Sequence, residues 1–402
     1  MVKYCILKSL YISLTGKRGE DFAGMELLIR GKQIYFTEEK RFAAGWILVR
    51  GGRIAEVGKG DGDVPACAQV LEAGEQYVAP GLVDVHTHGR IGYDFTDGSE
   101  EEMRQMRQSY AADGVTTLLP TLASAPLEQM LRAADRIRSV GFDGIHVEGR
   151  YLSEARRGAH KSELLAPPSV EELRLFMEHI GPLAVHFTLA PELPGGEAFV
   201  RAAVEAGATV ALGHSDASYE ETVRAFSYGV TAVTHLFNAL PPLHHRSPGP
   251  IGAALTEGAF VEIICDGFHL HPAAVKTVWQ AAPRDKLVLI TDSLAAARCS
   301  DGDYVLAGLK VFVRNGMATN EEGHISGSTI SLYDAVRNLM RFCGASLSEA
   351  LPFATINPAR MVGLDGLVGS IEKGKRADFC IIDPKTLEIS QVISRGVPQA
   401  AR

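Results

Sequence analysis

LVDVH, residues 82–86, opens a series of eight short apolar runs that decides the fold. The others are VTTLLP (115–120), GIHVE (144–148), AVHFTLA (184–190), TVALGH (209–214), TAVTH (231–235), VEIICD (261–266) and KLVLITD (286–292). Between them lie stretches such as SVEELRLFMEHI and YEETVRAFSYG, with apolar residues at helical spacing. Eight strand–helix units in about 250 residues predict a closed (β/α)8 barrel. An open doubly wound sheet is the alternative, but it usually carries a glycine-rich phosphate loop after its first strand, and the sequence has none.

The two ends of the chain differ from this central segment. Residues 25–79 contain short apolar runs separated by glycine and charged residues, and the tail from residue 362 returns to the same pattern, which is typical of strands and turns. We therefore predict an α/β fold, with a TIM-like (β/α)8 barrel over residues 80–361. A small β-sandwich domain is built from residues 25–79 plus 362–402. Residues 1–24 precede the first clear strand and are expected to be an N-terminal extension, either dispensable or the product of an upstream start site and then not native.

Composition excludes several classes of partner. The net charge of −8 argues against nucleic acid or an anionic membrane as the main partner. No apolar run approaches the ~20 residues that span a bilayer, and the opening segment has no clear signal cleavage site. The six cysteines are scattered without CxxC spacing, which is typical of reduced thiols. We expect a cytoplasmic protein that acts on a small molecule.

Polar residues suited to metal binding or catalysis end most of the predicted strands. They are His86 and His88 at the first strand, Glu148 at the third, His214 at the fifth, His235 at the sixth and Asp292 at the eighth. Barrel active sites form at the carboxyl ends of the strands, and residues at i and i+2 of a strand point to the same side. Imidazole and carboxylate together suit zinc, iron or manganese with positions open for water. Asp292 would then take a proton from water and pass it to a leaving nitrogen.

Several histidines and other polar residues of the chain can also be explained by purely structural roles. A single histidine at a strand end is more often a hydrogen-bonding group than a ligand, and His146, His179, His186 and His324 are interpreted in that way. Five strand ends that supply His, Glu or Asp together favour a metal site. The basic loop LHHR (243–246) fits either a phosphate-binding loop or a solvated surface loop. Asn238 is alternatively a cap of its strand, and Ser328 a cap of the helix that follows.

PGLVDVHTHG (80–89) is similar to the first-strand signature of the amidohydrolase superfamily, and ATINPARMVGL with GSIEKGKRADFCIID resembles its return into the β-sandwich domain. The ordered motifs HVEGRYLSEARRGAHK (146–161), LGHSDASYEE (212–221), THLFNALPPLHHRSPG (234–249), CDGFHLHP (265–272), LITDSLAA (289–296) and ISGSTISLYDAVRN (325–338) resemble the N-acetylglucosamine-6-phosphate deacetylase family. The resemblance runs from about residue 25 to about residue 385. It implies metal-dependent hydrolysis of the N-acetyl group of an N-acetylhexosamine 6-phosphate, with N-acetyl-D-glucosamine 6-phosphate as the first choice, to acetate and the amino sugar phosphate.

The same resemblance implies roles for single positions. Glu148, His214 and His235 match the ligands of the family's main metal, and His86 and His88 match a pair that binds a second metal in some members. One or two divalent ions are therefore expected, zinc first, with iron or manganese as alternatives. Asp292 matches the catalytic acid/base. The substrate-contacting segments match Ala159, His160, Asn238, Ala239, Arg246, Asp266, Gly267, Phe268, His269, Ile325, Ser326 and Gly327. Arg246 would hold the sugar phosphate, and His160 or His269 would orient the acetamide carbonyl.

Two positions depart from the family pattern. Arg150 stands where the third-strand motif usually has proline, and Ser293 stands where alanine is usual. We expect the loss of the proline to reshape the loop that carries Ala159 and His160. These departures leave the hexosamine epimer open, so that deacetylation of N-acetylgalactosamine 6-phosphate is an alternative.

The sequence also bears on other functions and on the assembly state. A different amidohydrolase reaction commonly uses a carboxylated lysine at the fourth strand end, where HFTLAPE has none. A non-enzymatic relative would usually have lost ligands, and every ligand position is filled. A homodimer is expected because Arg246 lies on a loop long enough to cross a subunit boundary.

Overall fold

The computed structural model describes residues 26–306 and 309–399. Eight parallel strands form one sheet in the order β14-β13-β12-β11-β10-β9-β8-β5. Their bounds are β5 (Leu82–Thr87), β8 (Val115–Leu122), β9 (Gly144–Glu148), β10 (Ala184–Leu189), β11 (Thr209–Leu212), β12 (Ala232–Val233), β13 (Phe260–Ile264) and β14 (Leu287–Ile290). Each strand overlaps one of the eight predicted runs, and the prediction of a barrel is confirmed.

Hydrogen bonds join the first and last strands of this sheet at their carboxyl ends. The backbone N–H of Asp292 donates to the carbonyl of His86 at 2.9 Å, and that of His88 donates to the carbonyl of Ser293 at 2.8 Å. Thr87 and Ser293 form a parallel bridge between the same two segments. The closure of the barrel therefore brings Asp292 beside the two histidines that end β5.

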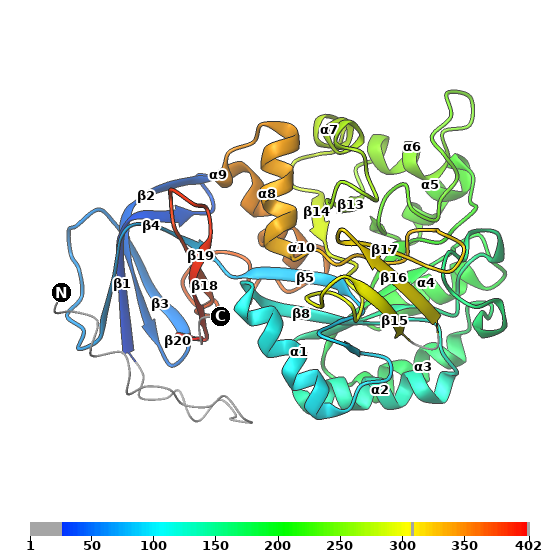
Figure 1. Ribbon diagram of the computed structural model, residues 1–402, viewed down its shortest axis with the longest axis horizontal. Coiled ribbons are helices and arrows are strands. Elements are labelled where there is room, and N and C mark those ends of the chain that lie inside the picture. Colours follow the sequence, from blue (N-terminus) through cyan, green and yellow to red (C-terminus); the bar gives the residue numbers. More distant parts are fainter. Residues whose placement is uncertain (1–25, 307–308, 400–402) are drawn as a thin grey trace.

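Helices follow the strands and cover the outer face of the sheet (Figure 1). They are α1 (Glu100–Ala112), α2 (Leu127–Val140), α3 (Val170–Ile180), α4 (Gly196–Glu205), α5 (Tyr219–Ser227), α6 (Gly249–Thr256), α7 (Pro272–Ala281) and α8 (Leu332–Cys343), with α9 (Leu347–Ala350) and α10 (Ile356–Met361) after them. Short 3₁₀ turns span Glu154–Arg156, Ser162–Leu164 and Leu351–Ala354, and a small ladder pairs β6 (Gly89–Arg90) with β7 (Tyr93–Asp94). Side chains of the eight strands are almost all buried, because helices cover one face and the barrel interior the other. Within the described residues, no helix is both long and apolar enough to cross a bilayer.

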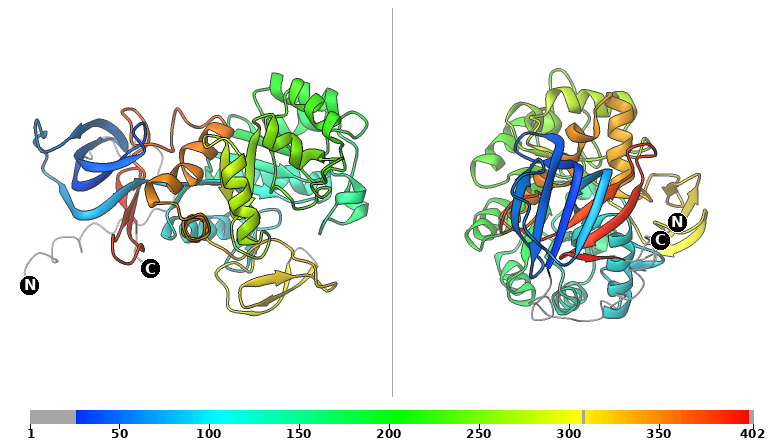
Figure 2. Two further views of the ribbon diagram at one scale, coloured as in Figure 1. Left: turned by 90° about the horizontal axis from the view of Figure 1, so that it is seen from above. Right: turned by 90° about the vertical axis from the view of Figure 1, so that its left-hand side faces the viewer.

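Strands from both chain ends form a second sheet. These are β1 (Glu26–Phe36), β2 (Arg41–Arg50), β3 (Arg53–Lys59), β4 (Val70–Pro80), β18 (Phe379–Ile382), β19 (Ile389–Ser394) and β20 (Val397–Pro398), in the order β20-β19-β18-β4-β1-β2-β3. β18 pairs antiparallel with β4, and Figure 2 (right) shows the blue and red strands side by side. Both chain ends therefore share one unit, as expected, while the exact domain boundaries stay a prediction. The expected extension over residues 1–24 lies outside the described residues.

A three-stranded antiparallel sheet between β14 and α8 was not expected from the sequence. It comprises β15 (Gly302–Leu306), β16 (Leu309–Arg314) and β17 (Met317–Thr319), and it projects from the barrel (Figure 2, left). Asn315 and Gly316 connect β16 to β17 with φ of 52° and 77°. An Asn-Gly pair with two positive φ angles is a strong hairpin signal, so this part of the inserted sheet is encoded locally.

Candidate metal centre

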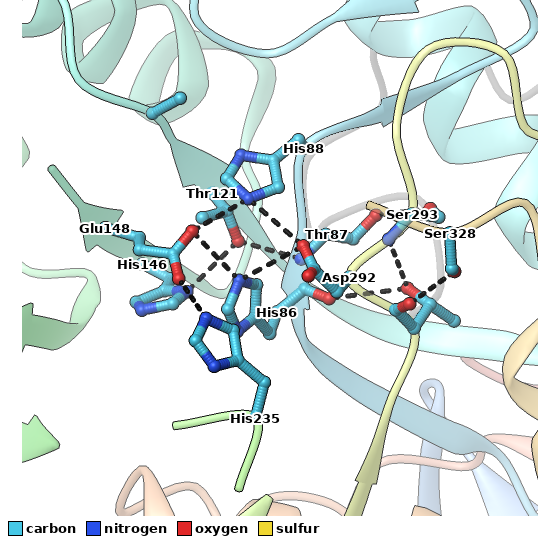
Figure 3. Close-up of polar contacts among 12 residues, drawn as sticks. His86, Thr87, His88, Thr121, His146, Glu148, His235, Asp292, Ser293 and Ser328 are labelled. Atoms are coloured by element: carbon cyan, nitrogen blue, oxygen red, sulfur yellow. Dashed lines mark hydrogen bonds and ion pairs between the residues drawn. The ribbon is translucent and has the colours of Figure 1, made fainter. Parts of the chain in front are cut away.

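Four imidazoles surround the carboxylate of Glu148, which ends β9 (Figure 3 shows three of them). One carboxylate oxygen, Oε1, lies 3.0 Å from Nε2 of His235 and 3.3 Å from Nε2 of His214. The other, Oε2, lies 2.9 Å from Nε2 of His88 and 3.2 Å from Nε2 of His86. All four histidines end barrel strands, so the carboxyl ends of β5, β9, β11 and β12 meet at one buried point.

Asp292 borders the same cluster. Its Oδ1 lies 3.3 Å from Nε2 of His88 and 3.5 Å from Nε2 of His86, and its side chain keeps 13% of its surface exposed. One donor atom each from His86, His88, Glu148 and Asp292 lies within 4.8 Å of the others. A carboxylate with access to solvent beside a set of ligand-type groups is the arrangement that proton transfer at a metal site requires.

Hydrogen bonding alone does not satisfy this cluster. Nε2 of His214 faces Nε2 of His235 at 3.1 Å. Nδ1 of His214 lies 2.9 Å from the carbonyl of Arg156, which can only accept, so Nδ1 carries the proton and Nε2 of the neutral ring carries a lone pair. Nε2 of His86 is buried and has no hydrogen-bond partner among the described residues. Nitrogen lone pairs and carboxylate oxygens that share one point fit a divalent cation.

The charges in the cluster lead to the same conclusion. Burial opposes ionisation of Glu148, but His86 and the other imidazoles hold its pKa well below the usual value. Burial opposes a charge on His88, yet hydrogen bonds to Asp292 and Glu148 raise its pKa to about 9. Burial is again outweighed at Asp292, where His86 and His88 lower the pKa to about 2. In the protein alone, protons on imidazoles balance two carboxylates, and a divalent cation would supply that charge instead.

Three residues of the cluster have unusual backbone conformations. His214, His235 and Asp292 have φ of 47°, 28° and 48°, in the region that non-glycine residues rarely adopt. Such conformations cost on the order of 1–3 kcal/mol each and concentrate at functional sites. Each of the three follows the end of its strand, where the sharp change of direction lets the side chain reach the cluster.

Sequence reasoning missed Glu262 in β13, which lies behind the ring of His86, on the side away from Glu148. Its Oε2 lies 3.3 Å from Nδ1 of His86, and its Oε1 lies 3.6 Å from Nε2 of His186. The carboxylate is completely buried, and although burial opposes ionisation, His186 and His86 lower its pKa to about 2. A carboxylate on the far nitrogen of a histidine fixes the orientation of the ring toward a metal. The available signal was a glutamate inside an otherwise apolar strand.

The other histidines interpreted as structural have partners that fit this interpretation. His146 lies between Thr121 (3.1 Å) and Thr188 (2.8 Å) inside the barrel. His179 contacts Asp135 at 2.8 Å between α3 and α2. His324 lies in an exposed turn beside Glu322.

The residues expected to contact substrate all lie on segments beyond the carboxyl ends of the strands, but at different positions. His160 reaches the cluster, with Nε2 4.0 Å from Oε2 of Glu148. His269 is held by Asp266 through a 2.7 Å contact from Nδ1. The amide of Asn238 donates to the carbonyl of His235 at 3.1 Å, which is the role of a strand cap. The remaining positions are exposed or half-buried: Ala159, Ala239, Gly267, Phe268, Ile325, Ser326 and Gly327.

Arg246 lies on an exposed loop and contacts its own neighbours. Its guanidinium lies 2.9 Å from Nε2 of His245, and its backbone N–H donates to Nδ1 of His244 at 3.3 Å. Among the described residues, no hydrogen bond or ion pair joins Arg246 to the Glu148 cluster, and its role stays a prediction.

The structure decides the alternative role of Ser328 and shows the surroundings of Arg150 and Ser293, the two positions that depart from the family pattern. The alternative that Ser328 caps the following helix is wrong, because Ser331 is the N-cap of α8 and accepts from the N–H of Asp334. Arg150 has φ of 68°, which proline cannot adopt, so the loop after β9 has a backbone course closed to proline. The hydroxyl of Ser293 lies 2.8 Å from the hydroxyls of Thr87 and Tyr110 in a buried cluster that an alanine would leave incomplete.

Comparison with known proteins places this geometry in a family. The model of the Amidohydrolase family matches residues 77–399. The N-acetylgalactosamine-6-phosphate deacetylase of Escherichia coli O157:H7 is 34% identical over 92% of this chain and 99% of its own length. The N-acetylglucosamine-6-phosphate deacetylase of Bacillus subtilis (strain 168) is 32% identical over 90% of this chain and 94% of its own.

Solved structures agree with these relatives. A mutant of N-acetyl-D-glucosamine-6-phosphate deacetylase from Mycobacterium smegmatis, in complex with N-acetyl-D-glucosamine-6-phosphate, superimposes with a TM-score of 0.87 at 34% identity, over 94% of this chain and all of that one. The enzyme from Thermotoga maritima superimposes with a TM-score of 0.83 at 32% identity, over 93% of this chain. The chain therefore belongs to the amidohydrolase family and, within it, to the N-acetylglucosamine-6-phosphate deacetylases.

Proposed function

We propose that this protein hydrolyses the N-acetyl group of an N-acetylhexosamine 6-phosphate in a metal-dependent reaction. One observation carries the proposal: a single carboxylate, Glu148, is surrounded by four imidazoles, with Asp292 at the edge of the same cluster. The products are acetate and the amino sugar 6-phosphate. Relatives of this activity that match nearly the whole chain support the same reaction.

The residues divide the work as follows. Glu148, His214 and His235 would hold the main divalent metal, and His86 and His88 would hold a second ion. A divalent metal at this position supplies a Lewis acid that makes water more acidic and polarises the amide carbonyl. The following step belongs to Asp292, whose carboxylate takes a proton as the water oxygen bonds to the acetyl carbon. When the C–N bond breaks, Asp292 returns that proton to the leaving nitrogen.

Substrate binding is assigned to the loops above the cluster. Arg246 would hold the phosphate, because its planar guanidinium suits two phosphate oxygens and the protein is acidic overall. The sugar would contact Ala159 and His160, Asn238 and Ala239, Asp266 to His269, and Ile325 to Gly327. N-acetyl-D-glucosamine 6-phosphate is the first candidate, because most of the matched relatives and the matched solved structures carry that name. N-acetylgalactosamine 6-phosphate is the second, because the Escherichia coli relative is named for it.

Three further proposals follow. Zinc is the first candidate metal, with iron or manganese as alternatives, because all three accept imidazole and carboxylate ligands. A homodimer is proposed, because Arg246 is exposed on its loop and would serve a site near a subunit boundary. A cytoplasmic location is proposed, because the cysteines of the described residues are free thiols.

The test is release of acetate from the 6-phosphates of N-acetylglucosamine, N-acetylgalactosamine and N-acetylmannosamine, with the corresponding unphosphorylated sugars as controls. Protein treated with a chelator and then reloaded with zinc, iron or manganese identifies the metal. We expect one 6-phosphate to be hydrolysed far faster than its unphosphorylated form, and activity to disappear with the metal. Hydrolysis of none of the 6-phosphates by the metal-loaded protein would contradict the proposal.

A further inference from the structure

His160 occupies an ambiguous place beside the metal centre. Its Nε2 lies 4.0 Å from Oε2 of Glu148, and its ring packs edge-on against that of His214 with centroids 4.9 Å apart. Atoms of Glu148, His160 and His214 lie within 4.8 Å of one another, as in a ligand set. The position alone therefore fits either a metal ligand or a hydrogen-bond donor to substrate. The tautomer of the ring decides between them, because a ligand needs a lone pair on Nε2 and a donor needs a proton there.

The contacts of Nδ1 answer this question. Nδ1 of His160 lies 2.8 Å from the hydroxyl of Ser124, and the backbone N–H of Ser124 also points at it, at 3.4 Å. A backbone N–H can only donate. Because that N–H needs the lone pair of Nδ1, the Ser124 hydroxyl, whose oxygen accepts the backbone N–H of Arg150 at 3.0 Å, is the donor in its contact with His160. Nδ1 is thus an acceptor, and in the neutral ring Nε2 carries the proton.

His214 and His269 have the opposite arrangement. His214 donates from Nδ1 to the carbonyl of Arg156 at 2.9 Å, so its Nε2 is a lone pair suited to a metal. His269 has Nδ1 2.7 Å from the carboxylate of Asp266, so its neutral ring also presents a lone pair from Nε2. Of these three rings, His160 is the one whose Nδ1 accepts hydrogen bonds, so it is the one that presents an N–H from Nε2.

The side chain and backbone of Arg150 fix the start of the loop that carries His160. Its guanidinium forms two contacts with Glu172, from Nε at 3.1 Å and from Nη2 at 3.0 Å, and the hydroxyl of Tyr151 adds a third at 2.8 Å. Its carbonyl accepts the N–H of Ala166 at 2.6 Å, which closes the loop of residues 151–165 on which His160 lies. Its φ of 68° aims the backbone N–H at Ser124. A proline here would have neither that N–H nor that backbone angle.

We propose that Ser124 and the backbone N–H of Arg150 are positioning groups that fix His160 in its Nε2–H tautomer, so that His160 donates a hydrogen bond to the acyl oxygen of the substrate instead of binding metal. The donation step rests on the proposed function, whereas the tautomer does not. A donor placed in advance at the acyl oxygen stabilises the negative charge that develops there when water adds. Ser124 thereby contributes to the reaction without touching the substrate or the metal.

The tautomer is tested by nitrogen NMR of zinc-loaded protein labelled with ¹⁵N-histidine, with the His160 signals assigned by their loss in His160→Gln. We expect a protonated Nε2 and an unprotonated Nδ1 in the parent. Ser124→Ala should give a mixture of tautomers, and Ser124→Thr, which keeps a hydroxyl, should restore the parent pattern. Arg150→Gly keeps the N–H and tolerates the positive φ, so it should also keep the parent tautomer. A protonated Nδ1 in the parent would overturn the proposal.

Metal content and kinetics provide the second readout. His160→Gln and Ser124→Ala should bind as much metal as the parent. Ser124→Ala should lower kcat roughly 2- to 10-fold with little change in KM, which is the size of one neutral hydrogen bond made in the transition state. Loss of metal from His160→Gln would make His160 a ligand and reject the proposal, as would an unchanged kcat in Ser124→Ala. If no amino sugar phosphate is hydrolysed at all, the proposed function fails, while the NMR and metal results still decide the tautomer.

Discussion

Replacement of Asp292 by asparagine tests the proton-transfer step with little disturbance of the fold. Asparagine has the same shape as aspartate, and after glycine it is among the residues best tolerated at the positive φ of 48° found there. The backbone N–H of residue 292, which donates to His86, is unaffected by the change. The variant should therefore fold and keep its metal ligands, so that the loss falls on catalysis.

The expected fall in kcat is large because neither of the other carboxylates beside the histidines can replace Asp292. Glu148 already faces four imidazoles with both of its oxygens. Glu262 is fully buried behind His86, on the side of the ring away from Asp292. Neither can move a proton between water and the leaving nitrogen. We expect kcat to fall roughly 10²- to 10⁴-fold, the usual contribution of a positioned acid/base.

The assay is steady-state acetate release at saturating substrate, with metal content and thermal unfolding measured on the same samples. Asp63→Asn is the matched control, because Asp63 is an exposed aspartate in the small sheet unit with a φ of 51°. The control should behave like the parent in every measurement. If Asp292→Asn keeps metal and fold and retains a kcat near the parental value, Asp292 does not transfer the proton and the reasoning is refuted.

The ligand pair at β5, Glu262, the charge of His88 and Arg246 can each be tested separately. His86→Gln combined with His88→Asn should lower the metal bound at saturation from about two ions per chain to about one, by elemental analysis; unchanged content would remove the pair from the ligand set. Glu262→Gln should weaken metal binding roughly 10- to 100-fold in a chelator competition, the usual effect of losing a support to a ligand, and affinity equal to the parent would make Glu262 merely structural. Because the pKa of His88 in the metal-free protein is about 9, a proton must leave when metal binds. Apparent affinity should then rise with pH up to about 9, by about tenfold per unit for each proton displaced, and calorimetry in buffers of different ionisation enthalpy should detect the release; a pH-independent affinity would contradict this. Arg246→Ala should raise KM for the 6-phosphate roughly 10- to 150-fold and leave the unphosphorylated sugar nearly unaffected, whereas equal effects on both would make Arg246 structural.

The barrel was predictable because its signal is local and repeated. Each of the eight apolar runs contains or overlaps one observed strand, since strands buried on both faces are continuous apolar segments. The convergence of His86, Glu148 and Asp292 was also predictable, because residues that end parallel strands meet at one edge of a barrel. What the strand pattern did not contain was the inserted sheet of β15 to β17, although its Asn315–Gly316 turn was visible.

The supporting residues were not predictable from strand ends. Glu262 lies in the middle of β13, two strands from β5 in the closed barrel, and contacts His86, 176 positions away in sequence. Ser124 lies just after β8 and reaches His160 through a loop whose course depends on the backbone angle of Arg150. Such contacts depend on how distant loops fold over the barrel, and no short motif records that. The exposed position of Arg246 was not predictable for the same reason, because the length of a loop does not determine the course of its backbone.

The two oxygens of Glu148 divide the histidines of the cluster into two pairs. Loss of one pair would have different consequences from loss of the other. Oε1 faces His214 and His235, while Oε2 faces His86 and His88. Asp292 approaches only the second pair. Loss of that pair would therefore leave the first ligand set intact. Where no second ion binds, it would also remove the two protonated imidazoles that lower the pKa of Asp292, and that pKa would rise. The double variant would then differ from the parent in both metal number and proton transfer. Measurement of both properties in that variant separates a two-metal enzyme from a one-metal enzyme that uses the pair to hold Asp292 ionised.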